Sequence, residues 1–364
     1  MVVKGLSLES GLQKNLELPN SPVENSQRPA IDLTLVSEVA NAVEIERQAP
    51  APLIKQPELI ITPDRDARFR PPAEVTSELL DTIAQRASTA KALPTTLVIV
   101  AHPDDEAIGA GGLLAGLPDA VVGHVTDGAP RDERYAQSKG FLTREEYARA
   151  RRREVVNALA HVGITPDRCR GLGYVDGEAS NHLLELVLDV ADLIDEVRPD
   201  IVLTHPYEGG HSDHDATAFA VQLACGILRR DRAPAPLVLE LTSYHNYSGT
   251  RRVFHFLPFI GTYHQTIRLT AAEKLLKKRM YDEFVSQKNV LEKFPINVEK
   301  FRPAPRYLFT SPPHEGQLDY ERFCSLITGA QWRKNAERAL DALRTRRHRF
   351  VQTFNRRRKP RIGR

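Results

Sequence analysis

The sequence has few cysteines and no long apolar run. Its three cysteines, Cys169, Cys225 and Cys324, are scattered and odd in number, which predicts no disulfide framework and fits a reducing compartment. No uninterrupted apolar stretch approaches the roughly 18–20 residues that a membrane helix needs. Residues 1–30 lack the continuous apolar segment of a secretory signal. These shortages lead us to expect a soluble, cytoplasmic globular protein.

A large net charge is also missing, but the balance hides an asymmetry. The chain carries +3 overall, whereas residues 344–364 contain ten Lys or Arg and no acid, which leaves residues 1–343 at −7. A tail of this kind can contact nucleic acid or an anionic membrane, or it can be a solvated end that favours solubility. Beyond Phe350 and Phe354 it lacks the aromatic residues that stack on bases.

Proline and charge divide the 364 residues into four predicted segments. Residues 1–91 form a Pro-rich N-terminal extension with a single predicted helix over 74–88, because stretches such as "APAPLIKQPELIITPDRDARFRPP" cannot sustain a long helix. The principal domain is predicted over 92–295. A helical C-terminal extension over 296–343 and the basic tail over 344–364 follow it.

Strand and helix patterns alternate within the principal domain. Buried strands are predicted at 97–100, 120–126, 200–206 and 237–246, and helices at 105–117, 144–161, 181–197, 270–291 and 319–347. Two T-x-x-E capping boxes begin at Thr143 and Thr270. The alternation predicts an α/β, Rossmann-like three-layer fold with a mostly parallel sheet. Ligands of such sheets bind at the carboxyl edge of the strands, so we expect the active site there.

The first motif, "AHPDDEAIGAGG", follows the strand at 97–100. A dinucleotide-binding loop is a poor explanation, because Leu114 occupies the third glycine position of G-x-G-x-x-G. Carboxylates at the start of the helix would also repel a pyrophosphate. A cation suits this group of His102, Asp104 and Asp105 far better.

His102 and Asp105 are three residues apart across Pro103, and an imidazole and a carboxylate are both ligands that Zn²⁺ accepts. Further donors follow the later strand, within "THPYEGGHSDHDAT": they are His205, His211, Asp213, His214 and Asp215. Both clusters are predicted at the same edge of the sheet. Desolvating so many ionisable groups together would be costly without a cation. From spacing alone, either His211 or His214 can be the third ligand.

The two motifs, "AHPDDE" and "GGHSDHDAT", resemble the signatures of the PIG-L/LmbE-like zinc-dependent deacetylases. That family removes acetyl groups from N-acetylglucosamine-containing compounds and related amides. The resemblance covers roughly residues 95–265. "VTDGA" at 125–129, R-x-x-E at Arg151 and "LGYVDG" at 172–177 also fall where the family has similar segments.

The resemblance implies a set of roles for these residues. It implies that His102, Asp105 and His214 bind one Zn²⁺ per chain, although Fe²⁺ can occupy similar sites. It further implies that Asp104 is the general base and that His211 faces the oxyanion, oriented by Asp213.

The substrate contacts are predicted less sharply. Arg151 and Asp176 resemble positions that hold sugar hydroxyls, while Arg151 can equally belong to a solvated helix face. Asp127 either lines the site or stabilises a turn. His205 is a candidate for the edge of the site or for a structural role, and Glu106 is interpreted as an acid at a helix N-terminus.

The leading hypothesis is therefore a metal-dependent hydrolase that removes acetyl from an N-acetylated amino sugar or glycoside. Two alternatives stay open at this stage. One is a phosphoesterase with two metal ions about 3.5–4 Å apart. The other is a binding module that the basic tail tethers to nucleic acid or membrane.

Overall fold

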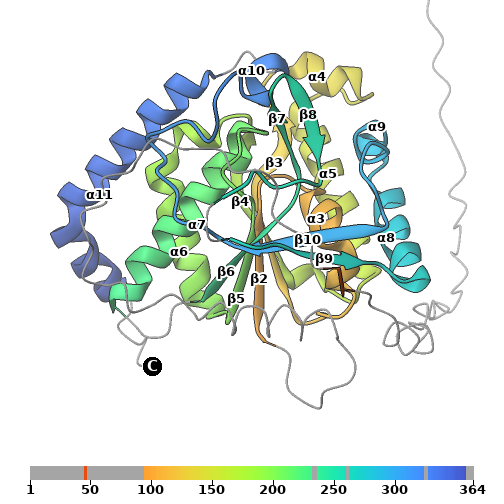
Figure 1. Cartoon of the computed structure of the whole chain (residues 1–364), viewed down its shortest axis with the longest axis horizontal. Helices are drawn as coiled ribbons and strands as arrows, with labels where there is room; N and C mark the ends of the chain where they lie inside the picture. The colour runs from red at the N-terminus through yellow and green to blue at the C-terminus, as the bar shows by residue number, and fades with distance from the viewer. Residues whose placement is uncertain (1–44, 47–93, 232–235, 260–261, 324–326, 358–364) are drawn as a thin grey trace, which may run out of the picture.

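The computed structural model describes residues 45–46, 94–231, 236–259, 262–323 and 327–357, so the helix predicted over 74–88 lies outside the described residues. Within them, a sheet in the order β1-β9-β10-β6-β5-β2-β3-β4 lies between two groups of helices (Figure 1). The strands from β6 to β4 run parallel, whereas β10, β9 and β1 are added antiparallel. The predicted mostly parallel α/β fold is confirmed.

The strands of this sheet differ in length, and the central strands β2 and β5 are buried. Their bounds are β1 Ile45–Glu46, β2 Thr96–Val100, β3 Val121–Pro130, β4 Cys169–Asp176, β5 Ile201–Thr204, β6 Leu237–Leu241, β9 Gln265–Arg268 and β10 Val298–Pro303. Every residue of β2 and β5 is buried, which explains why each is a continuous apolar run with one threonine at an end rather than an alternating pattern. A separate hairpin joins β7 (Tyr244–Tyr247) to β8 (Thr250–Val253).

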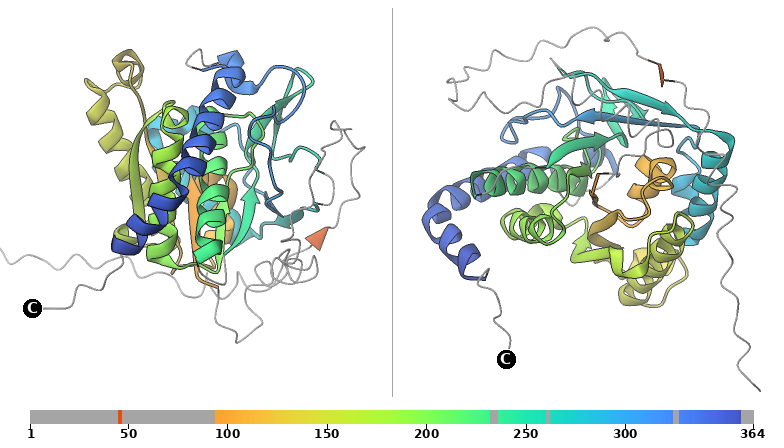
Figure 2. Two further views of the ribbon diagram at one scale, coloured as in Figure 1. Left: turned by 90° about the vertical axis from the view of Figure 1, so that its left-hand side faces the viewer. Right: turned by 90° about the horizontal axis from the view of Figure 1, so that it is seen from below.

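Helices cover both faces of the sheet. α3 (Asp105–Leu114), α5 (Arg144–Ala160) and α8 (Ala271–Glu283) pack in one core cluster, and α6 (Leu183–Val197), α7 (Ser212–Asp231) and α11 (Gly329–Arg357) pack in the other. Figure 2 shows α11, in dark blue, against the green helices α6 and α7. The remaining helices are α4 (Glu133–Ser138), α9 (Lys288–Leu291) and α10 (Asp319–Phe323).

The helix starts agree with the predicted caps. The hydroxyl of Thr143 accepts the amide of Glu146 at the start of α5. At the start of α8, Thr270 and Glu273 form both hydrogen bonds of a capping box. These local signals lie within a few residues of the element that they begin, so the sequence can specify them without knowledge of the fold.

Three predicted elements are divided in the structure. The strand predicted over 237–246 becomes β6 and β7, since the chain leaves the sheet at Thr242. The helix predicted over 270–291 becomes α8, which ends at Glu283, and the short helix α9. Between them, Ser286 donates its amide (2.8 Å) and its hydroxyl (2.7 Å) to Glu154. The helix predicted over 319–347 is divided into α10 and α11.

Strands β1, β4, β8, β9 and β10 were not predicted. Among the described strands β4 pairs with β3 alone, and it contains two glycines, so it lacks a clear alternating pattern. β10 lies inside the segment predicted as a helical extension, yet it joins the principal sheet. α11 also continues past Arg344, where the basic tail was predicted to begin. In the described part of the chain, no helix combines the length and the apolar character needed to cross a membrane.

Candidate active site

The two motif loops lie at the carboxyl ends of adjacent strands. β2 and β5 pair in parallel, with Ile99 opposite Thr204, so the residues that follow each strand emerge together at one edge of the sheet. Two helices also begin at this edge, α3 at Asp105 and α7 at Ser212. The sheet therefore brings together segments about a hundred residues apart.

Three of the predicted residues form a group that can hold a metal ion. His102, Asp105 and His214 are all buried, and each offers one donor atom within 4.8 Å of the other two. His102 Nδ1 is 3.2 Å from Asp105 Oδ2, and His214 Nε2 is 3.4 Å from Asp105 Oδ1. Two imidazoles and one carboxylate form a donor set that suits a divalent transition metal with an open coordination position. The residues present therefore fit the cation that the motifs imply.

The charges of the site keep two of these ligands in their metal-binding forms. Burial, helped by the neighbouring His205, lowers the pKa of His214 to about 4, so its imidazole is neutral at pH 7. Burial alone would raise the pKa of Asp105, but His214 and His205 hold it well below its usual range. Deprotonated donors are what a metal requires.

His205 packs against His214 of the metal group. Its ring lies parallel to that of His214, with centroids 3.9 Å apart, and its Nε2 accepts the amide of Ala101 at 3.1 Å. The side chain is fully buried. Of the two roles that the sequence left open for His205, the structural one accounts for these contacts, because the ring fixes the position of a ligand.

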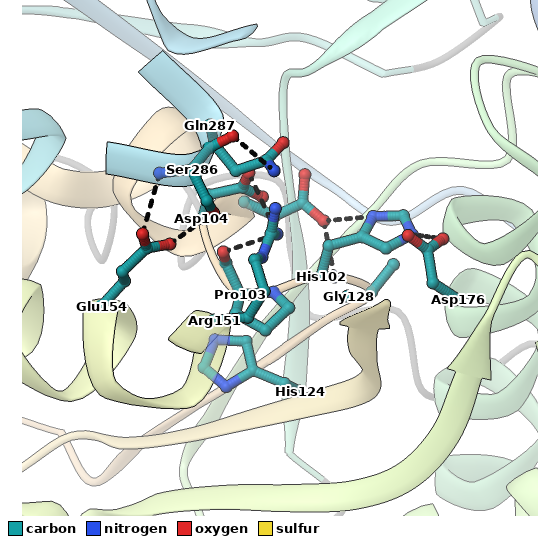
Figure 3. Close-up of polar contacts among 12 residues, drawn as sticks. His102, Pro103, Asp104, His124, Gly128, Arg151, Glu154, Asp176, Ser286 and Gln287 are labelled. Carbon is teal, nitrogen blue, oxygen red and sulfur yellow. Dashed lines mark hydrogen bonds and ion pairs between the residues drawn. The ribbon is translucent and has the colours of Figure 1, made fainter. Parts of the chain in front are cut away.

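A second potential metal group contains His102, Asp176 and His211, and it shares its histidine with the first. The other ring nitrogen of His102, Nε2, lies 3.1 Å from Asp176 Oδ1 (Figure 3). It also lies 3.4 Å from Asp213 Oδ2. If Nδ1 were the donor to an ion, a neutral imidazole would carry its proton on Nε2, toward these carboxylates. In that state the two carboxylates would hold the ring in its orientation. In the described residues the shared histidine argues against two simultaneous ions, which the phosphoesterase alternative needs.

Asp104 is buried beside the metal group. Arg151 donates to the carbonyl of Pro103 at 2.8 Å and to Asp104 Oδ2 at 3.3 Å (Figure 3). Burial raises the pKa of Asp104 to about 7, while the positive charge of Arg151 acts in the opposite direction. Asp104 can therefore exchange a proton near neutral pH. Arg151 is buried, so the solvated-face interpretation of this residue is wrong.

Glu106 also contributes to this turn. Its carboxylate accepts the amide of Asp104 at 3.2 Å and lies 2.9 Å from His124 Nε2. Although burial opposes it, the charge of Glu106 raises the pKa of His124 to about 10. Glu106 lies in the first turn of α3, as the sequence predicted, and it forms a buried ion pair beneath Asp104.

His211 and Asp213 lie on the other side of His102. The rings of His211 and His102 meet edge to face, with centroids 4.6 Å apart. The amide of Asp213 donates to His211 Nδ1 at 3.2 Å, whereas the Asp213 carboxylate is 4.0 Å from that nitrogen. The carboxylate instead accepts the amides of Gly177 (2.6 Å) and Ala179 (3.2 Å). The contact that orients His211 is thus made by the backbone of Asp213.

The three predicted substrate residues differ in their surroundings. Arg151 and Asp176 both contact residues of the metal-binding motif. Asp127 instead accepts the amide of Ala129 at 3.1 Å and pairs with Arg144. Its carboxylate therefore makes the turn contacts that were the alternative interpretation of this residue.

Sequence reasoning missed Tyr244 on β7 and Glu208 in the loop before α7. The ring of Tyr244 meets that of His214 edge to face, with centroids 5.5 Å apart. Glu208 is buried among polar groups of other elements. Neither residue belongs to a spaced motif. Glu208 nevertheless lies in the same loop as the predicted histidines, and this adjacency was a usable signal.

The fold and the site together define a class of protein: an α/β domain that presents a His/Asp metal group at the carboxyl edge of a parallel sheet. Residues 97–225 match the family described as PIG-L: GlcNAc-PI de-N-acetylase. The "Probable N-acetyl-alpha-D-glucosaminyl L-malate deacetylase 2" of Bacillus subtilis (strain 168) is 30% identical over 151 residues, which cover 40% of this chain and 67% of the relative. The chain belongs to the PIG-L family.

More distant similarities extend this comparison. The "1D-myo-inositol 2-acetamido-2-deoxy-alpha-D-glucopyranoside deacetylase" of Kineococcus radiotolerans is 28% identical over 198 residues, with 43% of this chain and 55% of that protein covered. The solved structure of teicoplanin deacetylase Orf2 in a zinc-inhibited form aligns with a TM-score of 0.46 at 18% identity, covering 59% of this chain and 99% of that one.

Proposed function

We propose that the protein is a metal-dependent hydrolase that removes the acetyl group from an N-acetylated amino sugar or glycoside. One observation carries the proposal. The metal group of His102, Asp105 and His214 is flanked on one side by Asp104, a carboxylate able to exchange protons, and on the other by His211. A hydrolase of an unreactive amide needs these three functions within reach of one carbonyl.

In this proposal His102, Asp105 and His214 hold one Zn²⁺ per chain, with Fe²⁺ as the alternative ion. An ion held by these residues would supply Lewis-acid chemistry: it would polarise the amide carbonyl and make a water molecule more acidic. The two ring nitrogens of His102 have different neighbours: Nδ1 faces Asp105 of the metal group, whereas Nε2 faces Asp176 and Asp213.

Asp104 is proposed as the general base. Its Oδ2 is fixed by Arg151, and burial raises its pKa to about 7, so its carboxylate form takes up a proton readily at neutral pH. The same carboxyl can then give that proton to the amine that leaves. Asp104 would thus serve both halves of the hydrolysis.

His211 is proposed to stabilise the oxyanion. Burial lowers the pKa of His211 to about 4, so its ring is neutral at pH 7. Because Nδ1 accepts the amide of Asp213, the ring proton is on Nε2, which can donate to an oxygen of the substrate. His211 would therefore stabilise the oxyanion as a neutral hydrogen-bond donor.

The substrate class is proposed from the family and its named relatives. Both curated relatives described above are named as deacetylases of glucosamine-containing compounds. Arg151 and Asp176 are proposed to bind the sugar, and Arg151 has the added task of holding Asp104. The two-metal phosphoesterase and the module tethered by its basic tail have no comparable support.

The first prediction tests Asp104. We expect Asp104→Asn to slow acetate release from N-acetylglucosamine derivatives by about 100- to 10,000-fold, because an amide cannot act as a general base. Metal content, measured by mass spectrometry of the purified protein, should stay at the wild-type level, since Asp104 is outside the metal group.

Glu145→Gln on the exposed side of α5 is the matched control, and it should keep wild-type turnover. Activity of Asp104→Asn close to that of the wild type would overturn the assignment of the base. A wild-type protein that binds metal and releases no acetate from any of these amides would overturn the function itself.

A further inference from the structure

The loop of residues 205–211, which joins β5 to α7 and ends at His211, is anchored by parts of the chain outside the family match. We call it the His211 loop. From within the matched segment, Asp215 accepts the amides of Glu208 (3.2 Å) and Gly209 (3.0 Å). Residues 205–210 of the His211 loop are buried, whereas His211 is half-buried. A loop so enclosed has a position that its surroundings determine.

Glu208 carries the principal outside anchor. Its carboxylate is buried and accepts three hydrogen bonds: from the amide of Leu257 (2.7 Å), from Arg302 Nη2 (3.0 Å) and from His245 Nδ1 (3.1 Å). Hydrogen bonds to a buried carboxylate are stronger than those between neutral groups. Glu208 is therefore a fixed point three residues before His211.

Arg302 in turn is held rigidly on β10. Besides Glu208, its guanidinium donates to Glu240 Oε2 (2.7 Å), the carbonyl of Leu257 (2.7 Å) and the hydroxyl of Tyr307 (2.9 Å). Arg302 is opposite Glu240 in the antiparallel pair of β10 and β6. A planar fork with partners on several sides has little freedom to turn. The Arg302 side chain is therefore fixed relative to strand β10.

The residues between Glu208 and His211 are both glycines. Gly209 has a φ of +70°, and a Cβ on Gly210 would lie 2.0 Å from the carbonyl oxygen of Tyr244. Two glycines in succession leave the backbone many conformations unless it is fixed at both ends. The amide of Asp213 fixes the far side of His211, and Glu208 fixes the near side.

We propose that Arg302, acting through Glu208, is a positioning residue that holds His211 in place for the reaction. The proposal rests on the proposed function, because it assigns how one residue of that site is aligned. It also makes β10, more than seventy residues after the family match ends, a working part of the site.

A double-mutant cycle tests the coupling. Arg302→Met should lower kcat for acetate release by about 10- to 100-fold, as expected for a misplaced reacting group. If Arg302 acts through His211, the same substitution in a His211→Ala background should cost less than about twofold, since coupled residues are not additive. Metal content and KM should change little, because His102, Asp105 and His214 do not touch Arg302.

Lys277→Met is the matched control. Lys277 is fully buried and pairs with Glu299 of the same strand β10 at 2.8 Å, but it donates to α3 rather than to the His211 loop. Its loss should destabilise the protein to a similar degree without coupling to His211. If Arg302→Met does not fold, Glu208→Gln enters the same cycle, because it removes the charge and retains the size of the side chain.

Hydrogen–deuterium exchange provides a measurement that needs no activity. Arg302→Met should speed exchange in peptides covering residues 205–214, whereas Lys277→Met should speed it in α3. Equal losses of kcat in both backgrounds, or unchanged exchange in the His211 loop, would overturn the positioning role. A wild-type protein that is inactive, with exchange that still follows the prediction, would refute the deacetylase proposal and leave the anchoring of the loop established.

Discussion

At the scale of single residues, the site depends on how burial changes the acidity of neighbouring groups. Asp104 and Asp105 are adjacent in sequence, yet burial raises the pKa of the first while two histidines hold that of the second well below its usual range. The difference follows from how far their neighbours offset burial: Arg151 only partly offsets it at Asp104, whereas His214 and His205 outweigh it at Asp105. When the surroundings of two neighbouring carboxyls give them different pKa values, one can carry a proton while the other stays ionised and can bind a metal.

This division predicts a pH dependence. Asp104 is active as the carboxylate, so kcat/KM should fall as the pH drops through the pKa of about 7. Arg151 lowers that pKa, and Arg151→Met should therefore move the acidic limb of the profile to higher pH, by about one unit or more. The measurement is kcat/KM against pH. Arg153→Met, on the exposed side of the same helix, should leave the limb in place.

At the scale of elements, the loops are held by close backbone contact as well as by side chains. Gly210 packs against the carbonyl of Tyr244 on β7, and the Tyr244 ring contacts His214. The loop before α7 and strand β7 thus form one unit around two of the site's histidines. The short helix α4 after β3 lies at the same edge of the sheet (Figure 1).

This contact predicts a sharp penalty at Gly210. Gly210→Ala should destabilise the protein by about 1–3 kcal/mol, because the new methyl group has no room. Turnover should fall as well, since His211 follows directly. In contrast, Gly226→Ala in α7 has open space around it and should stabilise by about 0.5–1 kcal/mol. Urea unfolding and kcat measured for both variants check the pair, and equal behaviour would contradict the packing argument.

At the scale of the whole molecule, the metal group joins two distant parts of the chain. His102 and Asp105 follow β2, whereas His214 belongs to α7 on the other side of the sheet. An ion bound to all three resists separation of these layers. The buried pair of Lys277 and Glu299 ties α8 and β10 to α3 in a similar way without a metal.

Metal removal should therefore weaken the fold. An ion at a hundred times its dissociation constant stabilises the native state by about 2.7 kcal/mol. We expect a chelator to lower the melting temperature of the wild type and added Zn²⁺ to restore it. His214→Ala should melt at one temperature with or without chelator. If the chelator left the melting temperature of the wild type unchanged, these residues would hold no stabilising ion.

Features of the fold and the site that are encoded in neighbouring residues were predictable, whereas features that depend on contacts between distant residues were not. The strands at β2 and β5, the caps of α5 and α8 and the His/Asp clusters of the two motifs are written in consecutive residues, so the sequence predicted them and their common edge. The insertion of β10 beside β6 could not be predicted in this way. Its pairing depends on contacts about sixty residues apart, and its own pattern, "VEKFRP", favours no single structure.

By itself, the sequence determined which donors follow each buried strand, because burial of a strand forces its polar successors to the sheet edge. Only the tertiary structure decided which partner each donor faces. It directed the Asp213 carboxylate to the amides of Gly177 and Ala179, and it placed Arg302 against Glu208. The physical reason is that a hydrogen bond depends on distance and direction in space, which chain order leaves free until the sheet is assembled.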